Sequence, residues 1–155
     1  MITYQVENYH DIEPELIAIY PEHYEELTVS KDFELDPDYF RYEKFADAGV
    51  LYCYTCREDG ALIGYIIFII QTALHYRTCM VAHEDIYYLR KDKRKGRTGI
   101  RLFQFAEDEL RKLNVNRVVY GTKTYLDNSK LFEYLGYTFF EKLYTKTINK
   151  TPLER

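Results

Sequence analysis

The sequence has no tryptophan and only three cysteines, four prolines and seven glycines in its 155 residues. Three cysteines cannot form a closed set of disulfide bonds, which excludes a small disulfide-stapled scaffold. Cys53 and Cys56 form a Cys-x-x-Cys pair, but they lie in the strand-like run VLYCYTC, where residues three apart point to opposite faces. No second ligand pair accompanies them, so neither a zinc site nor a redox site is predicted.

Long apolar runs are also missing from the sequence. The longest, from Leu62 to Ile70, is far too short to span a bilayer and instead predicts a buried strand. Neither end resembles a signal or transit sequence, so we expect a cytoplasmic protein with no membrane partner. The formal net charge of −4 and the pI near 5.6 argue against nucleic-acid binding over the whole surface. Any basic site must therefore be local and serve a compact anion.

The composition, 46% hydrophobic and 30% charged, is typical of a globular protein, and the length of 155 residues suits one domain. We expect that domain to span residues 1–150, followed by a tail of residues 151–155. Hydrophobic periodicity and turn residues indicate a mixture of strands and helices along the chain. The expected strands are residues 2–6, 50–57, 61–71, 80–89, 117–121, 138–143 and 143–148, and the expected helices are residues 12–27, 36–49, 98–113 and 129–135.

Proline, glycine and aspartate refine the boundaries of these elements. Pro21 is expected to kink or divide the first helix. Asp36 can cap the second helix, Pro37 can occupy its first position, and Gly49 can end it. Asp59-Gly60 predicts a tight hairpin between the second and third strands.

Residues 90–107, RKDKRKGRTGIRLFQFAE, place a run of cations between a strand and an amphipathic helix. A strand that passes through a glycine-containing loop into a helix offers unpaired N–H groups and the positive end of the helix dipole to an anion. The cations oppose that dipole, so their presence is explained if the loop binds a phosphate-bearing ligand. The alternative is an ordinary solvated charge run at the start of a helix.

This order of elements resembles the GNAT acyltransferase superfamily over almost the whole chain. In that family a strand ends in Val-x-Pro, and Arg/Gln-x-x-Gly-x-Gly/Ala follows at the head of a helix. Here Leu89-Arg90-Lys91 corresponds to Val-x-Pro, with Lys91 in place of proline. Arg94 to Gly99 corresponds to the glycine-containing motif, with Arg97 in place of its first glycine. The resemblance implies an α+β fold, in which about four helices flank a mixed, mostly antiparallel sheet of about seven strands.

The resemblance also implies acetyl-coenzyme A as the cofactor, with its pyrophosphate held by main-chain N–H groups and by nearby Arg or Lys. A second marker supports it, because DNSKLFEYLGY resembles the family's Asn…Leu-Tyr-Glu-Lys-Leu-Gly-Phe segment near the C-terminus. The cofactor-binding residues that the resemblance implies are Tyr87, Tyr88, Leu89, Arg94, Lys95, Gly96, Arg97, Thr98, Gly99 and Asn128.

In many family members the tyrosine of that segment protonates the departing thiolate of coenzyme A, and its position falls on Phe132 here. Phe132 cannot donate a proton. Tyr134 lies two positions further on, roughly opposite on a helix, so the role does not transfer to it directly. Tyr125, Tyr137 or a water molecule remain as donors.

Acyl transfer to an amine needs a group that takes the amine proton and donors that hold the thioester oxygen. In this family the donors are N–H groups of a splayed strand beside the loop, and the base often lies on that strand. The strand here is AHEDIYYL, so His83, Glu84 and Asp85 are all candidates for the base. Strand alternation separates them, because Asp85 shares a face with Tyr87, whereas Glu84 shares the other with Tyr88.

The chain further resembles a subset of small GNAT proteins, many from bacteriophages, in Leu74-His75-Tyr76, Asp85 and the helical His23-Tyr24-Glu25-Glu26. On this resemblance Asp85 and His75 form the proton-handling pair, with Glu84 as the substitute. The acceptor pocket is then lined by the helical His23 and Glu26 and by Tyr76. Lys123, just beyond the fifth strand, is a further candidate for that pocket, although loop and packing roles would explain many of these residues equally.

These residues predict an N-acetyltransferase that transfers an acetyl group directly to a primary amine in a ternary complex, because no cysteine has the setting of a nucleophile. A small amine, a polyamine or a protein lysine would suit the acidic first half of the chain. Two alternatives stay open: a non-catalytic GNAT-like protein that binds and modulates a partner, and an acetyltransferase that acts on aminoacyl-tRNA through residues 91–101. No metal ion and no nucleic acid other than that tRNA is expected, and a homodimer is left open.

Overall fold

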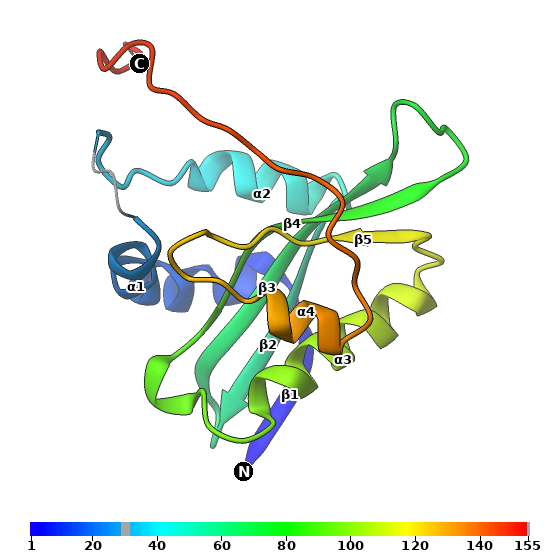
Figure 1. The fold of residues 1–155 in the computed structure, drawn as a ribbon. Coiled ribbons are helices and arrows are strands. Elements are labelled where there is room, and N and C mark those ends of the chain that lie inside the picture. The colour runs from blue at the N-terminus through cyan, green and yellow to red at the C-terminus, as the bar shows by residue number, and fades with distance from the viewer. Residues whose placement is uncertain (29–31, 155) are drawn as a thin grey trace.

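Within the described residues, five strands pair into one sheet in the order β1-β2-β3-β4-β5 (Figure 1). The computed structural model describes residues 1–28 and 32–154. The pairs β1–β2, β2–β3 and β3–β4 are antiparallel, and β5 is parallel to β4. The α+β fold with a mixed, mostly antiparallel sheet is therefore confirmed. In chain order the elements are β1 (Ile2–Glu7), α1 (Tyr9–Leu27), α2 (Tyr39–Asp47), β2 (Leu51–Glu58), β3 (Ala61–Thr72), β4 (Met80–Leu89), a short 3₁₀ helix (Lys91–Lys93), α3 (Thr98–Lys112), β5 (Arg117–Val119) and α4 (Ser129–Tyr134).

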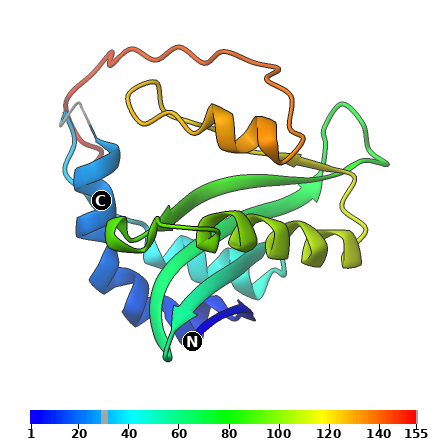
Figure 2. The ribbon, with the colours of Figure 1, turned by 60° about the horizontal axis from the view of Figure 1, so that its bottom comes forward.

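Apolar clusters lie on both faces of the sheet, with β3 buried between them. On one face, called the α1–α2 face below, side chains such as Leu16 pack on β2 and β3. On the other, called the α3–α4 face, the helices contribute Leu102, Phe103 and Phe132 (Figures 1 and 2). Burial of this much apolar surface is the main stabilising contribution to the fold.

The hairpin between β2 and β3 turns at Asp59 and Gly60, as predicted. Their φ angles are 50° and 86°, both in the left-handed region. Two successive residues with positive φ are typical of a type I′ turn, whose twist matches that of the flanking strands. The Asp-Gly pair therefore sets the register of the two most buried strands from a purely local signal.

Helix α1 is continuous from Tyr9 to Leu27 although it contains Pro14 and Pro21, so the prediction that Pro21 divides it is wrong. The helix also begins earlier than expected, because the side chain of Asn8 caps it by accepting a hydrogen bond from His10 N at 2.9 Å. Packing of its buried face compensates for the main-chain bonds that proline cannot make. Within the described residues, no helix combines the length and the apolar character that crossing a membrane would require.

Helix α2 begins at Tyr39, later than the sequence suggested. Asp38, rather than Asp36, is its cap and accepts a hydrogen bond from Arg41 N at 3.1 Å. Pro37 therefore lies outside the helix. Gly49 follows the last turn with φ 73° and its N–H donates to Ala46 O, as expected for a helix-ending glycine.

The two expected strands over residues 138–148 are wrong, and the sheet has five strands instead of about seven. This segment holds no Gly, Pro, Asn or Asp that would fix a hairpin, and its apolar side chains are exposed, with Leu143 at 84%. The aromatic and β-branched residues that suggested strands favour them only where they can pack on a sheet. The chain instead runs from α4 across the molecule toward α1, where Thr147 and Lys150 contact Asp32 (Figures 1 and 2).

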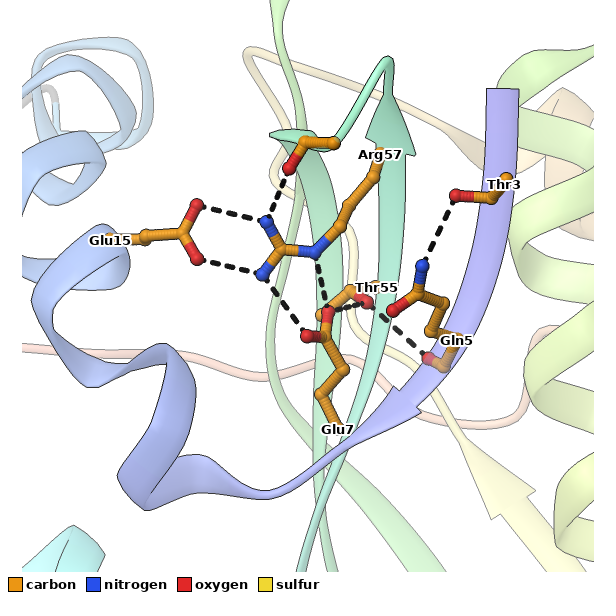
Figure 3. A network of polar contacts seen from close by, with 7 residues as sticks. Thr3, Gln5, Glu7, Glu15, Thr55 and Arg57 are labelled. Carbon is orange, nitrogen blue, oxygen red and sulfur yellow. Dashed lines mark hydrogen bonds and ion pairs between the residues drawn. The ribbon is translucent and has the colours of Figure 1, made fainter. Parts of the chain in front are cut away.

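A nearly buried guanidinium joins β1, β2 and α1 (Figure 3). Arg57 Nε donates to Glu7 Oε2 at 2.9 Å, and Arg57 Nη2 donates to Glu15 Oε1 at 2.7 Å. Arg57 Nη1 also donates to Gly60 O at 2.8 Å, which ties the network to the hairpin turn. Hydrogen bonds from the guanidinium to Glu15 lower the pKa of that carboxyl. Because every guanidinium nitrogen is bonded, this arginine has a structural role and fixes α1 to the sheet.

Candidate functional site

A bulge interrupts β4 at Asp85. Ile86 pairs with Ile67 of β3 and Glu84 pairs with Phe68, which leaves Asp85 opposite no residue. An extra residue of this kind bends the strand and shifts its alternation by one position. The predicted sharing of faces is therefore wrong: Glu84 lies on the α3–α4 face together with Tyr87, because their partners in β3 pack there.

Glu84 lies where β4 and β5 separate. The parallel pairing runs only as far as His83 and Val119, where β5 ends and its pairing with β4 stops. Glu84 Oε1 accepts a hydrogen bond from Gly121 N at 3.0 Å, across the separation. Burial raises the pKa of Glu84 to about 7, although the bond from Gly121 acts in the opposite direction. Glu84 can therefore take up or release a proton near neutral pH.

Asp85 lies on the opposite face of the same strand. Its carboxylate accepts a hydrogen bond from Tyr42 Oη of α2, which places it on the α1–α2 face. The residue keeps contact with solvent, but the protein around it raises the pKa of the carboxyl, and the bond from Tyr42 offsets part of that rise. His83, the third candidate for the base, is exposed on β4 opposite Ile69.

Tyr87 closes the separation between β4 and β5 from the α3–α4 face. Its hydroxyl donates to Gly121 O at 2.8 Å and accepts at 3.2 Å from Nδ2 of Asn128, the residue that precedes α4. Its ring lies edge-on to those of Phe132, at 5.8 Å, and Phe103, at 5.5 Å. Tyr87 and Asn128, which were both predicted as cofactor-binding residues, are therefore brought together at one point beside Glu84.

The basic loop, residues 90–97, leaves β4 and enters α3 with the amides of its last residues free. Within the described chain, the N–H groups of residues 95–100 donate no hydrogen bond. Gly96 has φ 69°, a conformation that other residues adopt with strain. At the base of the loop, Gly64 of β3 lets the strands approach, because a Cβ there would lie 2.9 Å from Leu89 Cδ1. The loop thus presents a row of main-chain donors to solvent beside the end of β4.

Carboxylates from other elements neutralise part of the charge of the basic loop. Arg94 forms a two-pronged ion pair with Glu26 of α1, and its Nε donates to Leu89 O at 2.7 Å. Lys93 pairs with Glu58. Arg94 and Glu26 were predicted for the cofactor and the acceptor respectively, but here they hold the loop against α1. The loop cations without an ion pair in the described residues are Lys91, Lys95, Arg97 and Arg101.

His23 is buried beneath this loop and does not line an open pocket. Its Nδ1 lies 2.7 Å from Tyr65 Oη, and its ring stacks on Tyr88 at 4.5 Å. Burial lowers the pKa of His23 to about 4, so the imidazole is neutral at physiological pH. The Tyr88 hydroxyl donates to Glu22 Oε1 at 2.7 Å, and the Arg94 guanidinium lies 5.5 Å above its ring. Through these contacts His23 and Tyr88 pack between α1 and the basic loop and support the loop.

The structure does not bring His75 near Asp85. His75 and Tyr76 lie in the exposed β3–β4 turn, at the opposite end of β4 from the basic loop (Figure 1). Asp85 lies five residues beyond Met80, the start of β4, which places it about 17 Å along the strand from that turn. Lys123 is exposed in the segment after β5, where its charge acts on Glu84. Among the described residues, no three His, Cys, Asp or Glu side chains form a set that could hold a metal ion.

The tyrosines that could replace the missing hydroxyl of Phe132 are engaged elsewhere. Tyr125 Oη donates to Leu27 O at the end of α1, and Tyr137 Oη donates to Glu107 Oε2 at 3.1 Å. Tyr134 is 62% exposed. Phe132 itself is buried in the aromatic cluster on the α3–α4 face. Of the described tyrosines on this face, Tyr87 therefore places its hydroxyl directly at the separation of β4 and β5.

Sequence reasoning did not connect Tyr42, Tyr9, Tyr20 and Glu13 with the site. All four lie on α1 or α2: Tyr42 donates to Asp85, Tyr9 stacks on Tyr42, and the charges of Asp85 and Glu13 both act on Tyr20. Their spacing along α1 is helical, but that pattern is the same for packing residues and for binding residues. The only available signal was the unusual number of tyrosines, 17 in all.

Comparison with known proteins relates this architecture to one family. A model of the Acetyltransferase (GNAT) family matches residues 11–137. Among curated proteins the chain has no match. A ribosomal-protein-alanine N-acetyltransferase from Brucella melitensis biovar Abortus 2308 has a similar structure, with a TM-score of 0.71 and 17% identity, over 96% of this chain and 100% of that one.

Two further solved structures share the fold at the same TM-score. One is a predicted acetyltransferase with acetyl-CoA from Clostridium acetobutylicum, with a TM-score of 0.71 and 11% identity over 96% of this chain and 97% of that one. The other is glucosamine-6-phosphate N-acetyltransferase from Arabidopsis thaliana, with a TM-score of 0.71 and 14% identity over 96% and 99%. Identities this low show the fold, whereas the family model covers most of the sequence. The chain belongs to the acetyltransferase (GNAT) family.

Proposed function

We propose that the chain transfers an acetyl group from acetyl-coenzyme A to a primary amine by direct attack. The observation that carries the proposal is the bulge in β4, which presents Glu84 to one face of the strand and Asp85 to the other. The strand leads into a loop whose amides are free from residue 95 onward, and its pairing with β5 ends beside Glu84. An acyl donor and an amine can thus approach one strand from opposite faces.

The basic loop fits the diphosphate of acetyl-coenzyme A. The free N–H groups of residues 95–100, together with Lys95 and Arg97, would hold the phosphates, while Arg94 positions the loop through Glu26. When bound, acetyl-coenzyme A supplies a thioester whose carbonyl carbon is open to attack by an amine. The separation of β4 and β5, edged by Leu89, Tyr87 and Asn128, is the place where this chain can hold the acyl end.

Asp85 is the proposed base, with Glu84 as the substitute. An amine attacks only in its neutral form, so the chain must accept a proton on the acceptor side of β4. Asp85 faces that side, and a carboxyl with a raised pKa is a stronger proton acceptor than an ordinary one. Glu84, with a pKa of about 7, lies on the opposite face and is bonded to Gly121 N. It can serve only if the acceptor passes between β4 and β5.

Tyr87 is the proposed proton donor on the side of the departing thiol. Its hydroxyl lies at the separation of the strands, where Asn128 donates to it and Gly121 O accepts from it. Burial raises the pKa of Tyr87, so the phenol keeps its proton at neutral pH. Because Phe132 packs against the same ring, Tyr87 can supply the hydroxyl that position 132 lacks.

The test combines thiol release with coenzyme binding by calorimetry. Gly99→Glu puts a carboxylate among the free amides, in a position where an added Cβ would only reach ordinary contact with Leu89 Cδ2 at 3.5 Å. An acidic residue in the first turn suits the helix dipole, so the fold should be retained. We expect coenzyme affinity to fall about a hundredfold or more, because several charge-assisted bonds would be lost.

The matched control is Gln104→Glu, which adds the same charge to an exposed position of the same helix. It should leave coenzyme affinity within about twofold of the original, since the charge lies beyond the first turn. Unchanged affinity in Gly99→Glu would refute the assignment of the loop. Tight coenzyme binding without thiol release for any amine would instead favour a non-catalytic binding protein, for which the missing hydroxyl at Phe132 is the supporting feature.

A further inference from the structure

Five polar side chains gather between α1, α2 and β4. They are Tyr9, Glu13 and Tyr20 of α1, Tyr42 of α2, and Asp85 of β4, and we call them the tyrosine–carboxylate cluster. Tyr42 donates to Asp85, and the rings of Tyr9 and Tyr42 stack at 5.4 Å. Burial, then the charge of Asp85 and, less strongly, those of Cys53, Tyr39 and Glu13, raise the pKa of Tyr20, so both carboxylates act on its hydroxyl. The cluster lies directly beside the bulge, on the α1–α2 face.

Three polar atoms of this cluster have no hydrogen-bond partner in the described chain. They are Tyr9 Oη, Tyr20 Oη and Glu13 Oε2. Tyr9 and Tyr20 are only 2% and 6% exposed. Burial, the neighbouring Tyr20 and then Glu13, one helical turn away, raise the pKa of Tyr9, so the Tyr9 hydroxyl and the Glu13 carboxylate are neighbours without a hydrogen bond of good geometry. Buried polar groups are nearly always satisfied, so an arrangement of three unsatisfied ones points to a bound group.

The carboxylates set this cluster apart from other buried hydroxyls. Tyr120 on the α3–α4 face also lacks a partner, but the carboxylates near it, Glu84 and Glu107, are bonded to Gly121 and to Arg111. By contrast, neither Glu13 nor Asp85 forms an ion pair with any residue in the described part of the chain. The cluster therefore carries negative charge that the protein itself leaves uncompensated.

An alkylammonium ion has the chemistry that this cluster lacks. Its N–H groups can donate to Glu13 and to the oxygen of Tyr20, and its charge compensates the carboxylates. The half-buried rings of Tyr42 and Tyr39, which stack on Tyr9 at 5.4 Å and on Tyr20 at 6.3 Å, can attract a cation and contact its methylene groups. A neutral or anionic acceptor would leave the same groups unsatisfied.

We propose that the tyrosine–carboxylate cluster binds a second cationic nitrogen of the acceptor, so that the acceptor is a diamine or longer polyamine. The inference rests on the proposed function, because it assigns the reacting nitrogen to Asp85 at the bulge. Glu13 and the Tyr20 hydroxyl, further along the α1–α2 face, hold the other nitrogen. Recognition of the acceptor then depends on its charge at a distance from the reacting atom.

The first experiment compares 1,4-diaminobutane with 1-aminobutane in the thiol-release assay with acetyl-coenzyme A. The two amines have the same carbon chain and differ by one nitrogen. We expect kcat/KM to favour the diamine by about tenfold to a hundredfold, the value of a charge-assisted bond to a buried carboxylate. Equal values for the two amines would overturn the inference and leave the proposed function intact.

The second experiment changes the cluster. Glu13→Gln and, separately, Tyr20→Phe should each reduce the preference for the diamine, with Glu13→Gln bringing the two amines to within about threefold. Glu133→Gln, which removes an exposed carboxylate on α4, is the matched control and should keep the full preference. A preference that survives unchanged in Glu13→Gln would also overturn the inference.

Calorimetry separates failure of the inference from failure of the proposed function. 1,4-Diaminobutane is titrated into the protein saturated with coenzyme A, so that binding is observed without turnover. We expect saturable binding that Glu13→Gln weakens about tenfold or more. If no amine releases thiol but this Glu13-dependent binding is present, the proposed function fails and the cation site stands. If Glu13→Gln binds the diamine as well as the original chain does, the cation site is refuted whatever the activity.

Discussion

The two faces of β4 differ sharply at the bulge, although they belong to the same strand. On the α3–α4 face, Glu84 and Tyr87 both bond to Gly121. On the α1–α2 face, Asp85 is bonded to Tyr42, while its neighbours Tyr20 and Glu13 keep unsatisfied atoms. The α3–α4 face thus fixes Glu84 and Tyr87 to one main-chain position beside the proposed acyl site, whereas the α1–α2 face keeps polar atoms that a ligand could satisfy. A single extra residue in the strand separates the two tasks.

The largest effect is expected at Asp85, where the comparison assigns the proton acceptor. Asp85→Asn removes the charge but keeps the shape and the bond from Tyr42 Oη. The turnover rate kcat should fall about a hundredfold or more, while coenzyme affinity stays within about twofold. Steady-state kinetics and calorimetry measure the two quantities. A larger loss of kcat in Glu84→Gln than in Asp85→Asn would move the base to the other face.

A smaller loss is expected at Tyr87, on the α3–α4 face of β4. Tyr87→Phe keeps the ring within the aromatic cluster but removes the bond to Gly121 O and the proposed proton donor. We expect kcat to fall about tenfold to a hundredfold, with the basic limb of its pH profile moved. Phe132→Tyr in the Tyr87→Phe background should restore part of the rate, since the two rings are neighbours. The assignment fails if the single variant is as active as the original chain with an unchanged pH profile.

Glu84 should reveal itself in stability as well as in activity. Because its pKa is raised to about 7 in the folded state, the carboxyl favours folding most below its ordinary value of 4.5, and that contribution is lost as pH rises through about 7. Glu84→Gln keeps an oxygen for Gly121 N and does not titrate. The free energy of unfolding is measured with urea at pH 5 and at pH 8. Relative to the original chain, the Glu84→Gln variant should be more stable at pH 8 than at pH 5, by on the order of 1 kcal/mol. Glu133→Gln, on an exposed site, should show no such trend.

The smallest expected effect concerns the ion pair that holds the basic loop to α1. Arg94→Lys keeps the charge but loses the second bond to Glu26 and the bond from Nε to Leu89 O. Both side chains are partly open to solvent, so stability should fall by only about 0.5–1 kcal/mol. Coenzyme affinity should fall a few-fold because the loop is less well ordered. A loss of affinity as large as that in Gly99→Glu would show that Arg94 contacts the coenzyme directly.

Features with local causes could be predicted from the sequence. The Asp59-Gly60 turn, Gly49 after α2 and the passage from β4 through the basic loop into α3 all depend on residues within a few positions of one another. Their conformations follow from backbone sterics and from the unpaired amides at a helix start. The elements that frame the site were therefore found with nearly the right limits.

Features that depend on distant residues could not be predicted in this way. No residue type marks the bulge at Asp85, because it arises from the register between β3 and β4. The pair of Arg94 and Glu26 joins residues 68 positions apart, so each was assigned to a different ligand. The expected strands over residues 138–148 failed for the opposite reason: their composition suits a sheet, but the chain provides no turn to pair them.

The most direct test of the central claim is a titration of the isotope-labelled protein with acetyl-coenzyme A, followed through the amide resonances of its backbone. The account predicts saturable shifts that are largest at residues 95–100 of the basic loop and at the end of β4, with Gly121 also affected. Shifts confined to other surfaces, or no saturation at millimolar coenzyme, would contradict it.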